Sequence, residues 1–245
     1  ILEIKYICLN KSVINDISKQ FKKNNLNILN IYCSSYVKSF FYKKDFENSK
    51  NIIFIDIGFE RSTALFYKNS KFQFINSKAI GGNNITKDIS KIFKLNDDYS
   101  EDLKEKFTKD ENEFSLSKNI SNKNNLYLEI KEKKISTKLL KQIIEARLDE
   151  IVELTVIKDS YFKKIYDLQK PKIIFLGSGS KLLSNTLNLE TKKFFSELVF
   201  KEDDDSKICT AGINYHTSEE RSLTWSKKKP RKLGFFESFF NLFSK

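Results

Sequence analysis

The sequence contains no methionine, one histidine, one tryptophan, two prolines and three cysteines in 245 residues. Cys8, Cys33 and Cys209 lie far apart and form no Cys-x-x-Cys pair, which argues for a reducing compartment and against a disulfide framework or a cysteine metal site. The single His216 excludes a two-histidine metal centre. The sequence shows no signal peptide and no apolar run long enough to span a bilayer. Because translation products normally begin with methionine and this chain begins at Ile1, we expect a fragment of a longer protein.

The composition predicts a folded, basic protein. Hydrophobic residues make up 40% of the chain and aromatic residues 13%, which is enough to bury a core, and the formal net charge is +12. Such a charge suits nucleic acid, an anionic membrane or an acidic partner. The lysines are mixed with acidic residues except in one block near the end, which consists of Lys227, Lys228, Lys229, Pro230, Arg231 and Lys232. No RNA-binding aromatic motif, zinc spacing or helix-turn-helix accompanies the block, so we expect no nucleic-acid binding.

The apolar pattern predicts an α/β chain with mixed sheets. Strands are expected at residues 3–9, 26–33, 51–58, 63–68, 72–80 and 172–176, and helices at 12–24, 84–93, 100–107, 137–154 and from 181 onward. Residues 45–50 and 217–232 are predicted as linkers, and residues 109–125 as a polar loop.

Three predicted turns carry residues suited to phosphate and metal chemistry. In the first, Asp56 ends a buried strand and can hold a hydrated Mg²⁺, while Gly58 lets backbone N–H groups approach phosphate. The second has Gly81 and Gly82 before a helix, and the third runs from Gly177 to Lys181 and presents N–H groups at a positive helix N-terminus. Taken singly, each turn also fits an ordinary capped turn without a ligand.

The order of these turns resembles the C-terminal two-thirds of the FtsA family of bacterial cell-division proteins, within the actin/Hsp70/sugar-kinase superfamily. Ile80–Ile89 is similar to the family pattern Val-Gly-Gly-Asn-x-Ile-Thr-x-Asp-Ile, and Ile143–Ile151 to Ile-Ile-Glu-x-Arg-x-x-Glu-Ile. Ser100–Lys104 resembles Ala-Glu-x-x-Lys. Gly177–Gly179 and Cys209–Gly212 stand where the family has its adenosine loop and a closing Ala-Thr-x-Gly.

This resemblance implies an actin-like ATPase fold, mainly its C-terminal lobe, that binds ATP with Mg²⁺ and has at most weak ATPase activity. Residues 1–48 would be the end of the family's inserted domain and residues 49–216 the nucleotide-binding lobe, with the first phosphate loop before Ile1. The resemblance assigns no catalytic residue, and it makes Asp56 the metal ligand. The implied nucleotide-binding residues are Asp56, Gly58, Ser62, Gly82, Glu101, Lys104, Gly177, Ser178, Gly179 and Lys181.

The chain departs from the family in its glycine loops. Phe59 and Glu60 stand where the family pattern Asp-Ile-Gly-Gly-Gly-Thr-Thr has glycines, so the loop is bulkier and more acidic. A carboxylate beside phosphate is repulsive unless a metal or Arg61 offsets it. Leu176 replaces the threonine of the adenosine loop, and Ser178 replaces one of its glycines. These departures put hydrolysis in question more than binding.

Residues 233–245 predict an amphipathic helix. At 100° per residue its apolar side chains fall within about 180° of the helix surface. They are Leu233, Phe235, Phe236, Phe239, Phe240, Leu242 and Phe243. A helix of about 20 Å cannot cross a hydrocarbon core of about 30 Å, but it can lie in the interface while the basic block attracts anionic lipid. We therefore expect a membrane-targeting helix; docking on its own domain or on a partner groove is the alternative.

Together, these features predict a cell-division adaptor of the divisome, at the septum on the cytoplasmic face of the bacterial inner membrane. It would tether FtsZ, through the lobe around residues 95–170, to the anionic cytoplasmic membrane and self-associate into actin-like filaments. The alternatives are a pilus-assembly relative, an Hsp70-like protein or a sugar-kinase-like protein. Their expected features are intact glycine loops or the absence of a membrane helix, which this sequence does not show.

Overall fold

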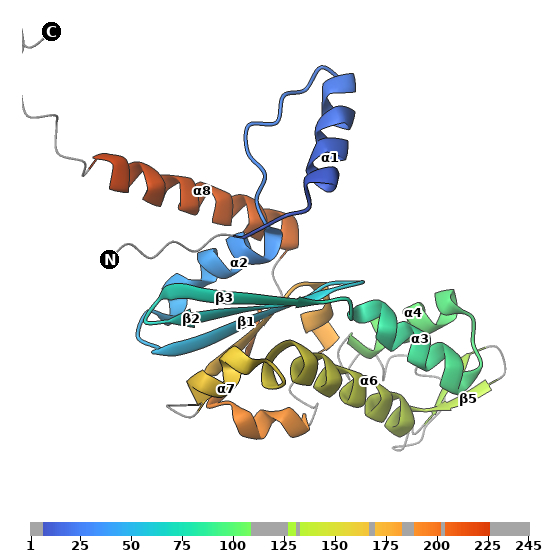
Figure 1. The fold of residues 1–245 in the computed structure, drawn as a ribbon. Coiled ribbons are helices and arrows are strands. Elements are labelled where there is room, and N and C mark those ends of the chain that lie inside the picture. Colours follow the sequence, from blue (N-terminus) through green and yellow to red (C-terminus); the bar gives the residue numbers. More distant parts are fainter. Residues whose placement is uncertain are drawn as a thin grey trace, which may run out of the picture.

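The structure is a computed structural model that describes residues 7–108, 127–130, 133–166, 170–182, 189–201 and 204–225. At its centre lies a five-stranded mixed sheet (Figure 1). Its strands are β1 (Asn51–Ile57), β2 (Ser62–Lys68), β3 (Lys71–Lys78), β6 (Lys172–Leu176) and β7 (Glu197–Phe200), in the order β3-β2-β1-β6-β7. The first three form an antiparallel meander, whereas β6 runs parallel to both β1 and β7.

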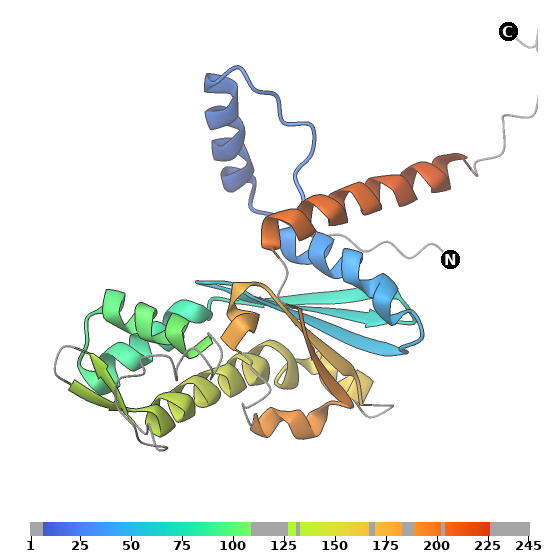
Figure 2. The same cartoon turned by 180° about the vertical axis from the view of Figure 1, so that it is seen from behind.

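Helices cover both faces of the sheet (Figures 1 and 2). One face carries α6 (Thr137–Val152), the π-helical turn η2 (Glu153–Ile157), α7 (Ser160–Tyr166) and the 3-10 turn η4 (Glu190–Phe194). The other face carries α2 (Ser34–Tyr42), the 3-10 turn η1 (Lys43–Phe46) and α8 (Asp205–Trp225). Beside the sheet lie α3 (Gly82–Phe93), α4 (Asp97–Thr108), the 3-10 turn η3 (Ser178–Leu182) and a hairpin of β4 (Tyr127–Ile130) and β5 (Lys133–Ser136).

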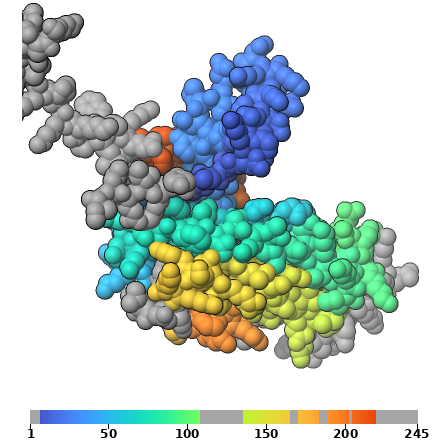
Figure 3. Space-filling view, in the orientation of Figure 1, coloured from blue at the N-terminus to red at the C-terminus, as the bar shows by residue number. Residues whose placement is uncertain are grey.

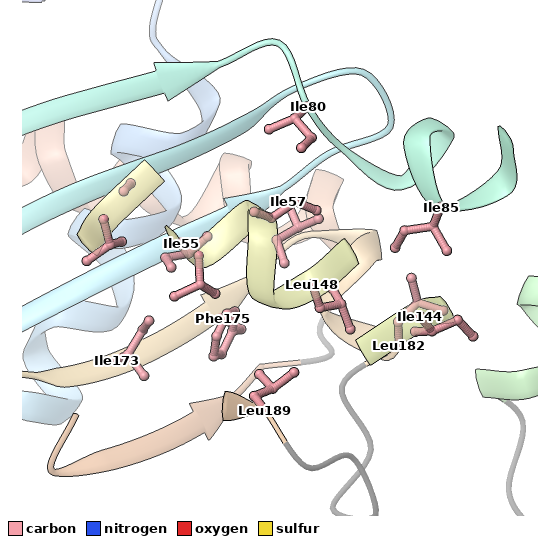
Figure 4. Close-up of a cluster of buried hydrophobic side chains, with 14 of the residues drawn as sticks. Ile55, Ile57, Ile80, Ile85, Ile144, Leu148, Ile173, Phe175, Leu182 and Leu189 are labelled. Atoms are coloured by element: carbon pink, nitrogen blue, oxygen red, sulfur yellow. The ribbon is translucent and has the colours of Figure 1, made fainter. Parts of the chain in front are cut away.

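The central strand β1 is buried along its whole length, as an apolar strand covered on both faces should be. Its side chains alternate between two cores. Ile53, Ile55 and Ile57 join the larger one with Leu148 of α6 (Figure 4). The alternate residues, including Phe54, join a smaller core against α2. Each face of the sheet therefore holds its own helical layer.

The contact between α2 and α8 depends on one glycine. A Cβ at Gly212 would lie 2.2 Å from the carbonyl oxygen of Val37, so the two backbones touch there. Gly212 closes the motif that resembles the family's Ala-Thr-x-Gly, and the structure gives this position a packing reason. In contrast, α1 (Lys11–Lys23) has no buried residue and stands out from the body with residues 24–31 (Figure 3).

Most of the predicted elements are confirmed, and several expectations differ from the structure. Residues 26–33, all of which the structure describes, contain no strand. The helix α2 lies over residues 34–42, where no element was predicted, and η1 extends into the first two residues of the expected linker at 45–50. Residues 217–225 continue α8 instead of forming a linker. Residues 178–182 form the 3-10 turn η3, which includes the first two residues of the helix expected from residue 181; residues 183–188 lie outside the described part of the chain. Residues 7–9 contain no strand. The remaining residues of that expected strand lie outside the described part of the chain, as do the expected polar loop, the basic block and the expected tail helix.

None of the helices in the described ranges has the length and apolar character that crossing a membrane requires.

Gly212→Ala should destabilise the fold, although alanine normally favours a helix, because the added methyl group must push α8 away from Val37. We expect a loss of about 1–3 kcal/mol in the free energy of unfolding, measured with urea. The matched control is Asn214→Ala on the exposed side of the same helix, which should cause no loss. Equal stability of the Gly212 variant and the wild type would contradict the close contact.

Candidate functional site

The first two glycine turns are joined backbone to backbone. The N–H of Gly82 donates to the carbonyl oxygen of Gly58 at 2.9 Å, and the N–H of Asn83 donates to that of Phe59 at 2.8 Å. A Cβ at Gly81 would lie 2.5 Å from the same Gly58 oxygen, so only glycine permits this approach. The N-terminus of α3 is therefore fixed directly against the loop that follows β1.

The third turn meets the first because β1 and β6 are parallel neighbours. Asp56 and Leu176 are paired in register near the ends of these strands, so the loops that follow leave the sheet at the same edge. Gly177 has a φ of +85°, and a Cβ there would lie 2.4 Å from Oδ1 of Asp56. Ser180 closes the turn by donating through N and Oγ to the carbonyl oxygen of Gly177, at 3.0 and 2.7 Å.

The three turns and α4 surround a cavity of about 350 Å³. It is lined by Gly58, Phe59, Gly82, Glu101, Lys104, Glu105, Ser178, Gly179, Lys181 and Leu182. Seven of the ten positions that the resemblance implies as nucleotide-binding are in this lining; Asp56, Ser62 and Gly177 are not. Sequence reasoning did not identify Glu105 or Leu182, and it noted Phe59 only as a departure from the family. A volume of this size lies within the usual range of small-molecule sites.

Lys104 is the buried centre of the α3–α4 contact. Its Nζ donates to Oε2 of Glu101 at 2.7 Å, to Oγ1 of Thr86 at 2.8 Å and to the carbonyl oxygen of Gly82 at 3.1 Å. Glu101 and Lys104, which the resemblance implies as nucleotide-binding residues, therefore pair with each other, and the pair ties α4 to the first turn of α3. The role of Thr86 was not apparent from sequence, because only the fold brings it to Lys104. The ring of Phe59 lies 5.8 Å from the Lys104 ammonium, above the cavity.

Asp56 faces α2 instead of the cavity. Its Oδ1 accepts a hydrogen bond from Nζ of Lys38 at 2.6 Å, and its Oδ2 accepts one from Oγ of Ser35, also at 2.6 Å. Nζ of Lys38 also lies 3.3 Å from Oδ1 of Asp205 at the start of α8. Both oxygens are hydrogen-bonded, one of them to an ammonium, and Asp56 is only 7% exposed, so the hydrated Mg²⁺ expected at Asp56 does not fit this arrangement. Among the described residues, no cluster of three or more His, Cys, Asp or Glu side chains is placed to hold a metal ion.

The ion pairs also set the protonation of Lys38. Burial alone would lower the pKa of Lys38, but the charges of Asp56 and Asp205 and their hydrogen bonds outweigh it and raise that pKa above 10.5. Lys38 was not found by sequence reasoning, since no helix was predicted over residues 34–42.

The remaining residues of the first loop lie outside the cavity. Ser62 is fully buried at the start of β2, and its Oγ has no hydrogen-bond partner within the described part of the chain. Glu60 is exposed and accepts a hydrogen bond from Nδ2 of Asn83 at 2.6 Å. Arg61 donates to Ser77 of β3 at 3.3 Å. Neither charged side chain therefore lines the space that a phosphate would enter.

Two residues of the resembling motifs bond to each other. Arg147 of α6 donates through Nε and Nη2 to the two carboxylate oxygens of Asp88 in α3, at 2.6 and 2.9 Å. Bidentate pairs of this kind fix geometry as well as charge. The motif at residues 143–151 thus holds α3, and with it the second glycine turn, against α6.

Comparison with known proteins gives one family and several structures of the same fold. The family model described as "Cell division protein FtsA" matches residues 53–211. No curated protein sequence matches the chain. MreB5 of Spiroplasma citri bound to ADP is similar with a TM-score of 0.62 and 16% identity, over 89% of this chain and 68% of that one. The PilM–PilN type IV pilus biogenesis complex is similar with a TM-score of 0.53 and 12% identity, over 84% of this chain and 55% of that one. The archaeal actin homolog Ta0583 is similar with a TM-score of 0.50 and 15% identity, over 77% of this chain and 54% of that one.

These structural similarities show an actin-like fold, as the sequence predicted, and at such low identity they show the fold alone. The chain spans only 54% to 68% of the length of these three structures.

The Lys38 pairs should make stability depend on alkaline pH. Because the pKa of Lys38 is raised in the folded state, its stabilising contribution is complete below 10.5 and is lost as the pH rises through the folded-state pKa. We expect the free energy of unfolding of the wild type to fall more steeply above this pH than that of Lys38→Gln/Asp56→Asn. Urea titrations of both proteins across the alkaline range measure this, and parallel pH profiles would rule out the coupling.

Proposed function

The chain belongs to the family of the cell division protein FtsA, and we propose that it is an ATP-binding adaptor that links FtsZ to the anionic cytoplasmic membrane at the division site. The observation that carries the nucleotide part is the cavity at which three glycine turns converge on Glu101 and Lys104. The family membership carries the division part. The similarity to the pilus complex is one of fold, so it gives no weight to a pilus role.

The cavity offers the groups that a nucleotide needs. Three of the residues that line it are glycines of the three turns, where a ligand can approach the backbone closely, and Lys181 supplies an exposed positive charge. Lys104 is engaged by Gly82, Thr86 and Glu101, so its role is to hold the wall in place. The side chain of Glu101 is 33% exposed and lines the cavity, where its carboxylate can accept hydrogen bonds from ribose hydroxyls. Structures of MreB5 with ADP and with AMPPNP support a nucleotide as the ligand class.

The proposal limits hydrolysis to weak activity at most. Phe59 occupies the loop position where the family has glycine, and its half-exposed side chain forms part of the cavity wall. A ring in this place takes up room beside the phosphates without contributing a charge or a proton-transfer group. Mg²⁺ would arrive bound to the ATP phosphates and would not be held by Asp56, because Asp56 is already bonded to Lys38 and Ser35.

The membrane and FtsZ parts of the proposal rest on the sequence and the family. The basic block and the seven apolar residues of the tail lie outside the described residues, so their support is their pattern: one wholly apolar face, one polar face and five basic residues just before them. FtsZ would bind the lobe around residues 95–170, and contacts between copies of the actin-like fold would build filaments. α8 supports this arrangement because it carries the chain away from the sheet before the basic block begins (Figure 1).

Lys181→Gln should weaken nucleotide binding without unfolding the protein, because Lys181 is exposed and lines the cavity. Loss of one charge-assisted contact to phosphate predicts about a tenfold increase in the Kd of a fluorescent ATP analogue, measured by anisotropy. Lys192→Gln, an exposed lysine of η4 outside the cavity, is the control and should bind as the wild type does. If neither the wild type nor Phe59→Gly binds the analogue, the nucleotide proposal fails.

Phe239→Asp/Phe240→Asp should abolish co-sedimentation of the chain with anionic liposomes, because both changes place a carboxylate on the apolar face. Ser238→Asp/Asn241→Asp adds the same charge to the polar face and should retain most of the binding. The adaptor role is then tested by adding FtsZ, which should sediment with the liposomes only when the wild-type chain is present. A wild-type chain that stays in the supernatant would overturn the membrane part of the proposal.

A further inference from the structure

Asp56 stands where the resemblance to FtsA implies a magnesium ligand, yet its surroundings are those of an ion pair. A carboxylate binds Mg²⁺ through free oxygen lone pairs, and Mg²⁺ demands an octahedral shell of oxygens. Both oxygens of Asp56 are already bonded at 2.6 Å, one to the Lys38 ammonium and one to the Ser35 hydroxyl. The cation beside Asp56 is therefore a side chain of this chain.

The Lys38–Asp56 ion pair is buried among the described residues. Lys38 is 4% exposed and Asp56 is 7% exposed. Gly177 closes the side toward the cavity, since a Cβ there would lie 2.4 Å from Oδ1 of Asp56. Asp205, at the start of α8, is the second carboxylate on Lys38 and is half exposed. A metal ion could reach Asp56 only by displacing Lys38, which would leave a buried ammonium with one exposed partner.

With Lys38 in place, the groups around Asp56 do not suit a divalent cation. Ser35 and Lys38 both project from α2, and one of them carries a positive charge that would repel the metal. Across the described ranges no group of three or more acidic, His or Cys side chains forms a metal shell. Lys38 instead supplies one unit of positive charge at hydrogen-bond distance, with a fixed direction set by its helix.

We propose that Lys38 permanently occupies the cation position at Asp56, so that this chain binds its nucleotide without a protein-held Mg²⁺. The first half of the inference, that Asp56 holds Lys38 and no metal, stands on the geometry alone. The second half rests on the proposed nucleotide-binding function. Because α2 carries Lys38 and α8 carries Asp205, the same ammonium also joins both helices of one layer to the end of β1.

The first half is tested with Mn²⁺ as a paramagnetic stand-in for Mg²⁺, titrated into the full chain without nucleotide and followed by the loss of the free-ion spectrum. The wild type should bind no Mn²⁺ that depends on Asp56. Lys38→Gln, which leaves the Asp56 carboxylate without its cation, should gain a site, and Lys38→Gln/Asp56→Asn should lose it again. Lys106→Gln breaks an exposed Lys–Asp pair in α4 and is the control that should gain nothing.

Absence of Mn²⁺ binding to the wild type would support the first half without the need for any variant to fold. Mn²⁺ binding to the wild type that disappears in Asp56→Asn would overturn the inference. A folded Lys38→Gln variant that gains no Mn²⁺ site would overturn it as well, because Lys38 would then not stand in the place of a metal.

The second half is tested by the Kd of a fluorescent ATP analogue in the presence of Mg²⁺ and in the presence of EDTA. For the wild type we expect a change of less than about threefold, and for Lys38→Gln a loss of about tenfold or more in EDTA. A tenfold loss for the wild type would overturn the second half. Absence of binding in both conditions would instead overturn the proposed function, while the Mn²⁺ titration would still decide the assignment of Asp56.

Discussion

The parallel pairing of β1 with β6 is the constraint on which the site depends. These strands lie more than a hundred residues apart in sequence, yet Ile52 pairs with Lys172 and Asp56 with Leu176. The pairing brings the loops after both strands to one edge of the sheet, where Gly177 packs on Asp56 and α3 packs on Gly58. A ligand cavity at this edge is the usual consequence of adjacent parallel strand ends. β1 is apolar on both faces, and this secures the pairing because its side chains alternate between two separate cores.

Much of this fold follows from local patterns, and the misses have identifiable causes. β1, β2, β3 and β6 have apolar runs bounded by turn residues, and α6 has a regular apolar stripe, so their positions were predictable from sequence. α2, with the sequence Ser-Ser-Tyr-Val-Lys-Ser-Phe-Phe-Tyr, is rich in residues of middling helix propensity and has no clear helical stripe. The helix is held by partners elsewhere in the sequence. Ser35 and Lys38 both bond to Asp56, and Ser39 bonds to Tyr67.

The candidate site also has a part that the sequence predicts and a part that it does not. Glycines at close contacts were predictable as positions, because Gly58, Gly82 and Gly179 follow strands in a recognisable order, and the spacing of Glu101 and Lys104 placed them on one helix face. The partners of these residues were not predictable. Lys38 reaches Asp56, and Thr86 reaches Lys104, only after the chain has folded, and no local signal marks either residue. The sequence therefore indicates where a ligand would sit more clearly than which side chains fix the charge there.

The length of α8 has a mechanical consequence. A helix of 21 residues is about 30 Å long, and its contacts with α2 described above lie between its first residue, Asp205, and His216 just past its middle. The second half extends beyond α2 (Figure 2). A rotation of α8 by about 10° about its close contact at Gly212 would move its far end by a few ångströms. The distance of Trp225 from the sheet is thus set by the contacts that α8 makes with α2 between Asp205 and His216.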